Sequence, residues 1–290
     1  MKTLPVFMAA NDAYACFAAT TLMSIAEHTA NPLQFHLFDD GIAPWRRQTL
    51  LGVAARYPHV DLAIHGNLDR RLDDCPCPWY RTRAIFSRYY SADLFPEYGL
   101  SLYVDVDMIF QADVAELFSL GTQEHGLAAC HDMCLDAIID ASRHKAALGI
   151  APEHGYFNNG MILINGPVWR ADGVSEHLTR IALERRPGVT FPSQDPMNIY
   201  FSPNRYRLLP PRWNSMPSSP RAVPDPAVLH YTLTKPWHEP ASPDADRFWE
   251  IARRSPFASE IWWKRQQWRI VKPVRRFRKA MARFGACSQA

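Results

Sequence analysis

The chain has 290 residues, a formal net charge of +3 and a hydrophobic content of 47%. This length fits one large α/β domain or two modest ones, and the apolar content suffices for a sizeable core. No apolar run approaches the ~20 residues that a membrane-spanning helix requires. Asn11 and Asp12 split the apolar start of the chain, which predicts a strand and a turn there instead of a signal peptide. We therefore expect a cytoplasmic protein whose six cysteines are free thiols.

Predicted strands and helices alternate through the first hundred residues. A strand at 3–10 and a helix at 14–28 come first. They are followed by strands at 33–38, 60–64 and 100–104 and by helices at 44–57 and 85–95. This alternation is typical of a parallel, doubly wound α/β sheet. In such a sheet ligands bind beyond the carboxyl ends of the strands, at a switch point in strand order.

The second half of the chain is less regular. A further buried strand is predicted at 161–164. Ten of the 24 prolines lie between residues 202 and 243, which predicts mostly loop with short extended pieces. A loop that long inside a compact domain is more often functional than accidental.

Two carboxylates interrupt the apolar stretch SLYVDVDMIF at residues 101–110. Asp105 and Asp107 follow the predicted strand at 100–104 and, at alternate positions, share one face. Buried carboxylates are costly unless a positive group meets them, and two neighbouring ones repel each other. Three interpretations follow from the residues: a metal site, a pair of strand-end caps, or a salt-bridged structural pair.

Six segments in a fixed order carry a resemblance to a known family. They are VFMAANDAY, FSRYYSADLF, LYVDVDMIF, YFNNGMILIN, SQDPMN and HYTLTKPWH, and they span roughly residues 4–250. With them the chain resembles the family 8 retaining glycosyltransferases, most closely the bacterial lipo-oligosaccharide galactosyltransferases. The resemblance implies a GT-A-type, Rossmann-like α/β fold with a central, mostly parallel sheet, which we assign to residues 1–259.

The resemblance also implies a Mn²⁺ site made by Asp105, Asp107 and His230, with Mg²⁺ as the alternative ion. Two carboxylates and one imidazole suit Mn²⁺ better than zinc or calcium and leave positions free for phosphate oxygens. Without the resemblance, His230 is more simply interpreted as a packed histidine in a proline-rich loop.

The family pattern further implies contacts with a nucleotide-sugar donor. Lys235 would reach the diphosphate as a compact point charge, and Asp132 and Asn158 would contact hydroxyls of the sugar. Gln194 and Asp195 would face the anomeric carbon as the catalytic pair. The complete set of implied donor-binding residues is Ala9, Asn11, Asp12, Tyr14, Arg88, Asp105, Val106, Asp132, Asn158 and Lys235.

The chain departs from the family pattern at the nucleotide end of the site. Close relatives have an acidic residue and an asparagine where this chain has Asn11 and Ala13. Tyr14 is retained and can stack on a pyrimidine, so a uridine nucleotide is still favoured. Asn159 replaces a small residue after Asn158, which predicts a reshaped sugar pocket.

The expected activity is transfer of galactose or glucose from a UDP-hexose to a saccharide or glycolipid acceptor, with retained anomeric configuration. A growing lipopolysaccharide or lipo-oligosaccharide core is the expected acceptor. Gln194 is expected to position the sugar during same-face attack, because an amide oxygen is a poor nucleophile. Two alternatives remain: a metal-dependent phosphohydrolase or nucleotidyltransferase, and a non-catalytic binder of sugar nucleotides. No nucleic-acid motif is visible.

The carboxyl end has a different composition from the body. Residues 264–290 contain nine Lys or Arg and no Asp or Glu, which leaves the preceding residues at −6. Beyond Pro273, apolar residues spaced 3, 4 and 3 apart predict one face of a helix: Val274, Phe277, Met281 and Phe284. We predict that residues 260–290 bind an anionic membrane surface, at the inner face of the cell membrane. The competing interpretations are a nucleic-acid patch and a helix packed on the acidic body.

Overall fold

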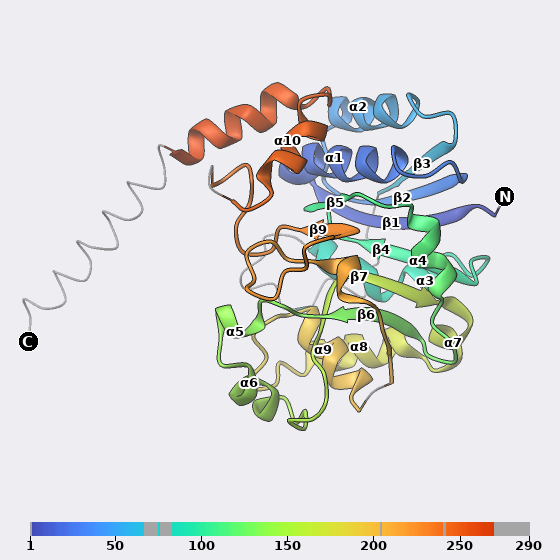
Figure 1. Cartoon of the computed structure of the whole chain (residues 1–290). Coiled ribbons are helices and arrows are strands. Elements are labelled where there is room, and N and C mark those ends of the chain that lie inside the picture. Colours follow the sequence, from blue (N-terminus) through green and yellow to red (C-terminus); the bar gives the residue numbers. More distant parts are fainter. Residues whose placement is uncertain (1, 67–74, 76–82, 204, 240–241, 270–290) are drawn as a thin grey trace, which may run out of the picture.

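The computed structural model describes residues 2–66, 75, 83–203, 205–239 and 242–269. Within them a seven-stranded sheet, in the order β3-β2-β1-β4-β7-β6-β8, forms the centre of the molecule (Figure 1). A separate two-stranded sheet pairs β5 with β9. The strands are β1 (Leu4–Asn11), β2 (Leu33–Asp40), β3 (Val60–His65), β4 (Leu100–Val104), β5 (Met108–Phe110), β6 (Leu127–His131), β7 (Phe157–Asn165), β8 (Arg207–Leu208) and β9 (Val228–His230).

The central sheet is mostly parallel, which confirms the predicted fold class. β1 pairs in parallel with β2 and β4, β2 with β3, and β6 with β8. β7 is antiparallel to both of its neighbours, β4 and β6. The strand order runs outward from β1 in both directions, to β2 on one side and to β4 on the other. β1 and β4 therefore form the switch point at which α/β proteins bind their ligands.

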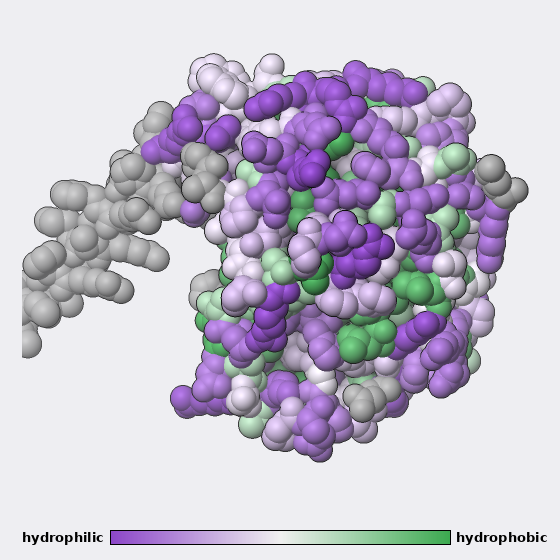
Figure 2. Space-filling view, viewed as in Figure 1, coloured by the Kyte–Doolittle hydropathy of each residue, from purple (hydrophilic) through white to green (hydrophobic). Residues whose placement is uncertain are grey.

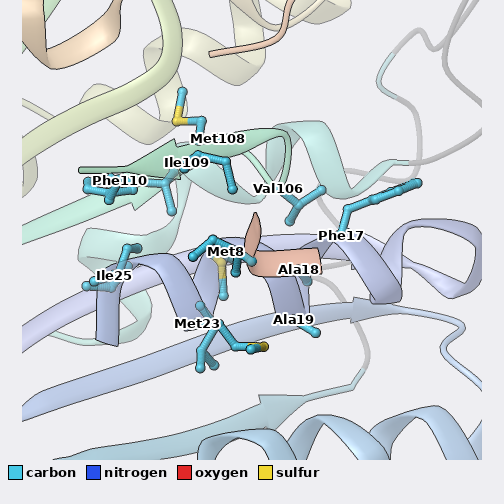
Figure 3. Packing of buried hydrophobic residues seen from close by; sticks show 14 of the residues in the cluster. Met8, Phe17, Ala18, Ala19, Met23, Ile25, Val106, Met108, Ile109 and Phe110 are labelled. Carbon is cyan, nitrogen blue, oxygen red and sulfur yellow. The ribbon is translucent and has the colours of Figure 1, made fainter. Parts of the chain in front are cut away.

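Alternate residues of the central strands enter two different cores, one on each face of the sheet. Val6 and Met8 of β1 belong to one core, and Phe7 between them belongs to the other. Because successive side chains on a strand point to opposite faces, a strand with both faces covered needs a continuous apolar sequence. Figure 3 shows the first core, in which side chains of α1 (Ala15–Ala26) pack with Met8, Val106 and Ile109.

The helices divide between the two faces. α1, α2 and α10 contribute to the first core, and α7, α8 and α9 contribute to the second; the two groups lie at opposite ends of the molecule in Figure 1. The labelled α-helices after α1 are α2 (Pro44–Ala54), α3 (Ser91–Leu94), α4 (Val114–Leu120), α5 (Leu135–Ile138), α6 (Ala141–Ala147), α7 (Gly166–Ala171), α8 (Val174–Leu183), α9 (Gln194–Phe201) and α10 (Ala245–Ala252).

The prediction of one continuous helix at 85–95 is wrong. This segment forms a 3₁₀ helix, η3 (Arg83–Tyr89), followed by the single turn α3. Ser87 Oγ donates to the Ala84 carbonyl at 2.7 Å, and Arg88 Nε donates to the Ile85 carbonyl at 2.8 Å. Side chains that bond to carbonyls three residues back offer an alternative to α-helical hydrogen bonding.

The proline-rich segment at 202–243 is mostly loop, as predicted. It contains β8, the 3₁₀ helix η4 (Pro211–Asn214) and β9. The cysteines for which the structure gives a pairing state, Cys16, Cys75, Cys130 and Cys134, are all free. The viewed face of the molecule is mainly hydrophilic (Figure 2). In the described part of the chain, no helix is both long and apolar enough to cross a membrane.

Residues 258–269 form a helix that packs on the body, drawn in red in Figure 1. Ile261 is completely buried and belongs to the first core, together with Phe257. The predicted division between residues 259 and 260 falls inside this helix. The helix predicted from Pro273 onward lies outside the described residues.

Candidate active site

A cavity of about 630 Å³ opens beyond the carboxyl ends of β1 and β4. This volume is in the range typical of small-molecule sites. All of the predicted site residues line it except Asp12 and Asp195. Those that line it are Ala9, Asn11, Tyr14, Arg88, Asp105, Val106, Asp107, Asp132, Asn158, Gln194, His230 and Lys235.

The small β5–β9 sheet brings His230 to the two aspartates. Met108 of β5 pairs with His230 of β9, and the Tyr231 amide donates to the Asp107 carbonyl at 3.0 Å. Asp105 is held to β7 by its own amide, which donates to the Gly160 carbonyl at 2.7 Å. Asp105, Asp107 and His230 each offer a ligand atom, and these atoms lie within 4.8 Å of one another.

A chain of amides fixes the orientation of the His230 ring. Asn158 Nδ2 donates to the Asp132 carboxylate at 3.1 Å, so its Oδ1 is left to accept from Asn214 Nδ2, also at 3.1 Å. Asn214 Oδ1 in turn accepts from His230 Nδ1 at 2.9 Å. A neutral imidazole that donates through Nδ1 carries a lone pair on Nε2. That Nε2 lies 3.3 Å from Asp107 Oδ1.

The donor set fits a divalent cation. Asp107 Oδ1 is buried and has no hydrogen-bond partner, although it faces His230 Nε2. A lone pair directed at a carboxylate oxygen is unfavourable unless a proton or a cation lies between them. Two carboxylates with one imidazole are typical ligands for Mn²⁺ or a similar ion. Asn214 supplies the second-sphere hydrogen bond that usually orients a metal-binding histidine.

Gly160 of β7 lies directly behind this cluster. A Cβ atom at this position would lie 2.4 Å from His230 Cε1 and 2.7 Å from Asp105 Oδ2. Contacts that short require the neighbouring atoms to move, so only glycine lets β7 approach the cluster as it does. We expect any larger residue at this position to displace Asp105 and His230, two of the three candidate ligands.

Two cations compensate the aspartates. Arg88 Nη2 lies 2.8 Å from Asp105 Oδ1, and Lys235 Nζ pairs with Asp107 Oδ2. Burial raises the pKa of Asp105 despite the attraction of Arg88. Burial also acts to raise the pKa of Asp107, but Lys235 and His230 outweigh it and hold that pKa below its usual range. The alternative of a salt-bridged pair is therefore partly correct, because each aspartate has its own cation.

A hydrogen-bonded group of polar side chains forms the opposite wall. Gln194 Nε2 donates to Asp132 Oδ2 at 2.9 Å, and Gln194 Oε1 accepts from Asn158 Nδ2 at 3.2 Å and from the Asn159 amide at 3.1 Å. Asn159 Nδ2 donates to Ser193 Oγ at 3.2 Å. These bonds hold the amide of Gln194 in one orientation at the cavity surface.

Asp195 lies behind this wall and not in the cavity. It is completely buried. Its Oδ1 accepts from His144 Nε2 at 2.8 Å and from the Tyr156 hydroxyl, and its Oδ2 accepts from the amides of Thr190 and Phe191 at 2.7 and 2.9 Å. With both oxygens engaged, Asp195 fixes the start of α9 and has no free lone pair directed at the cavity.

The end of the cavity at which the sequence predicts the nucleotide is built on the turn that follows β1. Asn11 Oδ1 accepts from the Tyr14 amide at 3.2 Å and caps the 3₁₀ helix η1 (Asp12–Tyr14). Asn11 and Tyr14 line the cavity. Asp12 points away from it, with Oδ1 accepting from the Ala43 amide at 2.9 Å.

Sequence reasoning did not identify Asn214 or Gly160. Asn214 lies in a proline-rich segment without periodicity, and its role depends on the pairing that brings η4 beside β9. Gly160 lies inside one of the quoted segments, YFNNGMILIN. A glycine within a buried strand indicates close approach of another group, which is the signal that would have found it.

Comparison with known proteins identifies the family. The model of glycosyl transferase family 8 matches residues 5–241. The chain belongs to this family. It is 28% identical over 247 residues to a lipopolysaccharide 1,3-galactosyltransferase of Salmonella typhimurium, covering 79% of this chain and 72% of the relative. It is 25% identical over 231 residues to a lipopolysaccharide 1,2-glucosyltransferase of Escherichia coli K12, covering 72% of this chain and 64% of that relative.

Solved glycosyltransferases share the fold. The galactosyltransferase LgtC, solved with donor and acceptor sugar analogs, superimposes with a TM-score of 0.73 and 22% identity, covering 87% of this chain and 96% of LgtC. The bifunctional glycosyltransferase WbbM gives a TM-score of 0.76 with 19% identity, covering 90% of this chain and 51% of WbbM. These likenesses confirm the GT-A-type fold.

Proposed function

We propose that this family 8 glycosyltransferase transfers a hexose, galactose or glucose, from a UDP-sugar to a saccharide acceptor with retained anomeric configuration. The observation that carries the proposal is the cluster of Asp105, Asp107 and His230. It lies at the switch point of the sheet, beside a cavity large enough for a nucleotide sugar. The curated relatives that act on lipopolysaccharide support a lipopolysaccharide or lipo-oligosaccharide core as the acceptor.

Asp105, Asp107 and His230 would hold the cation, for which Mn²⁺ is the proposed ion. When bound, it supplies Lewis acidity to the diphosphate as UDP leaves. Lys235 binds the diphosphate as a point charge from the rim of the cluster, where it contacts Asp107. The Arg88 side chain is only 3% exposed, and its ion pair holds the Asp105 carboxylate in place. Tyr14 offers its ring to the uracil base.

Asp132 and Asn158 bind hydroxyls of the donor sugar, and Gln194 faces its anomeric carbon. The hydrogen bonds of Gln194 Oε1 to Asn158 and Asn159 support a positioning role, because they engage the only atom of Gln194 that could attack the sugar. We therefore favour attack by the acceptor on the face that UDP leaves. Asp195 acts through α9, by holding Gln194 in place.

We further propose that the basic tail, residues 260–290, associates with anionic lipid at the inner face of the cell membrane. The side chains of Trp262 and Trp263 support this proposal, since they are 47% and 59% exposed. Tryptophan is enriched at the depth of lipid headgroups, and each nearby basic residue adds about 1 kcal/mol. Such an association would place the enzyme at the surface where a membrane-anchored glycolipid acceptor lies.

A panel of UDP-sugars, incubated with the protein and Mn²⁺, tests the function. We expect slow hydrolysis of one donor without acceptor and sugar transfer when an acceptor saccharide is added. Release of UMP and hexose 1-phosphate instead of UDP would indicate the alternative, a phosphohydrolase. Binding of UDP-sugars without any turnover would indicate a non-catalytic binder.

A further inference from the structure

An ion-pair network connects the turn η1 at the nucleotide end of the cavity to the helix at 258–269. Arg46, in the first turn of α2, lies between two carboxylates. Its Nη1 pairs with Asp12 Oδ2, and its Nη2 lies 2.9 Å from Glu260 Oε1. The side chains of Arg46 and Glu260 are 15% and 21% exposed, so the bond between them is largely shielded from water, whereas the Asp12 side chain is 44% exposed. Shielding strengthens the bond to Glu260 relative to pairs on an open surface.

The network fixes η1 from the side opposite the cavity. Asp12 accepts from the Ala43 amide with Oδ1 and pairs with Arg46 through Oδ2. The Ala43 amide and Arg46 together hold the pKa of Asp12 below its usual value. Asn11 and Tyr14, on either side of Asp12, are cavity residues. Any movement of Asp12 therefore moves two residues that would contact the nucleotide.

Glu260 supports the far side of the network. The next residue, Ile261, is completely buried in the first core, which fixes the position of the helix. Glu260 Oε1 also lies 3.5 Å from Lys264 Nζ, one turn further along the same helix. A planar guanidinium that contacts two fixed carboxylates with separate nitrogens is restricted to one arrangement.

We propose that Arg46 is a positioning residue for donor binding, which holds η1 against α2 and the helix at 258–269 so that Asn11 and Tyr14 are preorganised for the nucleotide base. The proposal rests on the proposed function, because it concerns the same donor site. Preorganisation improves affinity by reducing the entropy lost on binding, without adding a contact. Arg46 acts through Asp12 and does not line the cavity.

The test compares UDP binding by calorimetry, in the presence of Mn²⁺, with kcat and KM for donor hydrolysis. In Arg46→Gln we expect the Kd for UDP and the KM for the donor to rise about tenfold, as for loss of one charged contact. We expect kcat to stay within about twofold, since α9 and the metal cluster are untouched. Arg254→Gln is the matched control: Arg254 pairs with Glu27 at 2.7 Å and lies outside the cavity lining.

Glu260→Gln keeps the shape of the side chain and breaks the same network at its other end. It therefore provides a second test if Arg46→Gln does not fold properly. We expect a smaller rise in Kd, and no further rise when both substitutions are combined, because both act through one bridge. Unchanged UDP affinity in Arg46→Gln and Glu260→Gln would overturn the proposal, as would a loss of kcat at constant KM. A wild-type protein that neither binds UDP nor hydrolyses any UDP-sugar would instead contradict the proposed function.

Discussion

His230 Nε2 lies 3.3 Å from Asp107 Oδ1, and because His230 Nδ1 donates to Asn214, a neutral His230 ring directs the lone pair of Nε2 at that oxygen. Two electron-rich atoms held this close repel each other unless a positive charge lies between them. The relationship explains why two aspartates follow a buried strand in this sequence. Their charges are compensated by Arg88 and Lys235, and the remaining partnerless oxygen of Asp107 is available to a cation.

Asp107→Asn should abolish transfer while the protein remains folded. The substitution removes the negative charge at the centre of the cluster, and with it most of the affinity for a divalent ion. We expect activity to fall at least 100-fold, an estimate for the loss of a direct ligand, and chelator to have the same effect on the wild-type enzyme. Activity is measured by UDP release and folding by circular dichroism.

Asp113→Asn provides the matched control for this experiment. Asp113 caps α4 through a hydrogen bond from the Ala115 amide at 2.8 Å, and asparagine caps helices about as well. We expect this variant to keep full activity and stability. Full activity in Asp107→Asn, or in chelated wild-type enzyme, would contradict the metal assignment.

Asn214→Ala should weaken the response to Mn²⁺ without removing any direct ligand. Loss of the bond to His230 Nδ1 frees the ring to rotate and to change tautomer. Such second-sphere changes typically cost about 10- to 100-fold in metal affinity. In a Mn²⁺ titration we expect a higher half-saturating concentration and recovery of much of the rate at saturating Mn²⁺. An unshifted titration would mean that Asn214 does not support the metal site.

The sequence predicted the switch point and the two aspartates because these depend on local patterns. Runs of buried apolar residues mark β1 and β4, and a carboxylate at the end of such a run is visible without knowledge of the fold. β5 and β9 are only three residues long each, too short for any periodicity. Their pairing is what carries His230 to Asp107, so that contact follows from the resemblance to a family and not from the residues alone.

The side chains of neighbouring residues in a motif can also point in different directions. Gln194 and Asp195 open α9, where consecutive side chains point about 100° apart. Gln194 therefore reaches the cavity while Asp195 points into the protein beneath it. Asn11 and Asp12 diverge in the same way at the end of β1. Motif matching placed all four at the donor site, and only the fold separates the residues that face the cavity from those that support them.

Gln194→Ala should leave a small residual rate with retained anomeric configuration. The expectation follows from its positioning role, since another group must then make the bond to the sugar. The configuration of the product is determined by proton NMR of the anomeric hydrogen immediately after transfer. Product of inverted configuration from the wild-type enzyme would contradict the retaining mechanism.

Asp195→Ala should lower the activity more than Gln194→Ala does, and it should also lower the stability of the fold. It leaves the Thr190 and Phe191 amides and the Tyr156 hydroxyl without their buried acceptor. Each unsatisfied buried group costs about 1–3 kcal/mol. We expect a lower melting temperature and a larger loss of activity than in Gln194→Ala. A stable Asp195→Ala variant with normal activity would show that this support is dispensable.

His36 should make the protein less stable in mild acid. Burial, with the neighbouring His65, lowers the pKa of His36 to about 4 from an ordinary value of 6.5. The unfolded chain therefore binds a proton that the folded chain resists, and stability falls as the pH drops from about 6.5 to about 4. His36 Nδ1 and Nε2 each contact a partner at 2.9 Å, His65 and the Tyr98 hydroxyl.

The measurement is urea unfolding of wild type and His36→Gln at pH 7.5 and pH 4.5. Glutamine does not titrate, so the variant should lose less stability between the two pH values, by on the order of 2 kcal/mol. The comparison at pH 7.5 corrects for any packing defect, because both side chains are neutral there. An equal loss of stability in both proteins would assign the acid sensitivity to other groups.

Deletion of residues 270–290 should release the protein from anionic vesicles while sparing transfer to a small soluble acceptor. The deletion leaves the helix at 258–269, whose Ile261 belongs to the core, and removes Lys272 and the basic residues that follow it. We expect the full chain to float with vesicles that contain anionic lipid and not to bind neutral vesicles. Binding to the anionic vesicles should weaken as the salt concentration rises. If the shortened protein still floats with anionic vesicles, residues 270–290 are not the anchor. If it loses activity on the soluble acceptor, the tail contributes to the enzyme itself and not only to its location.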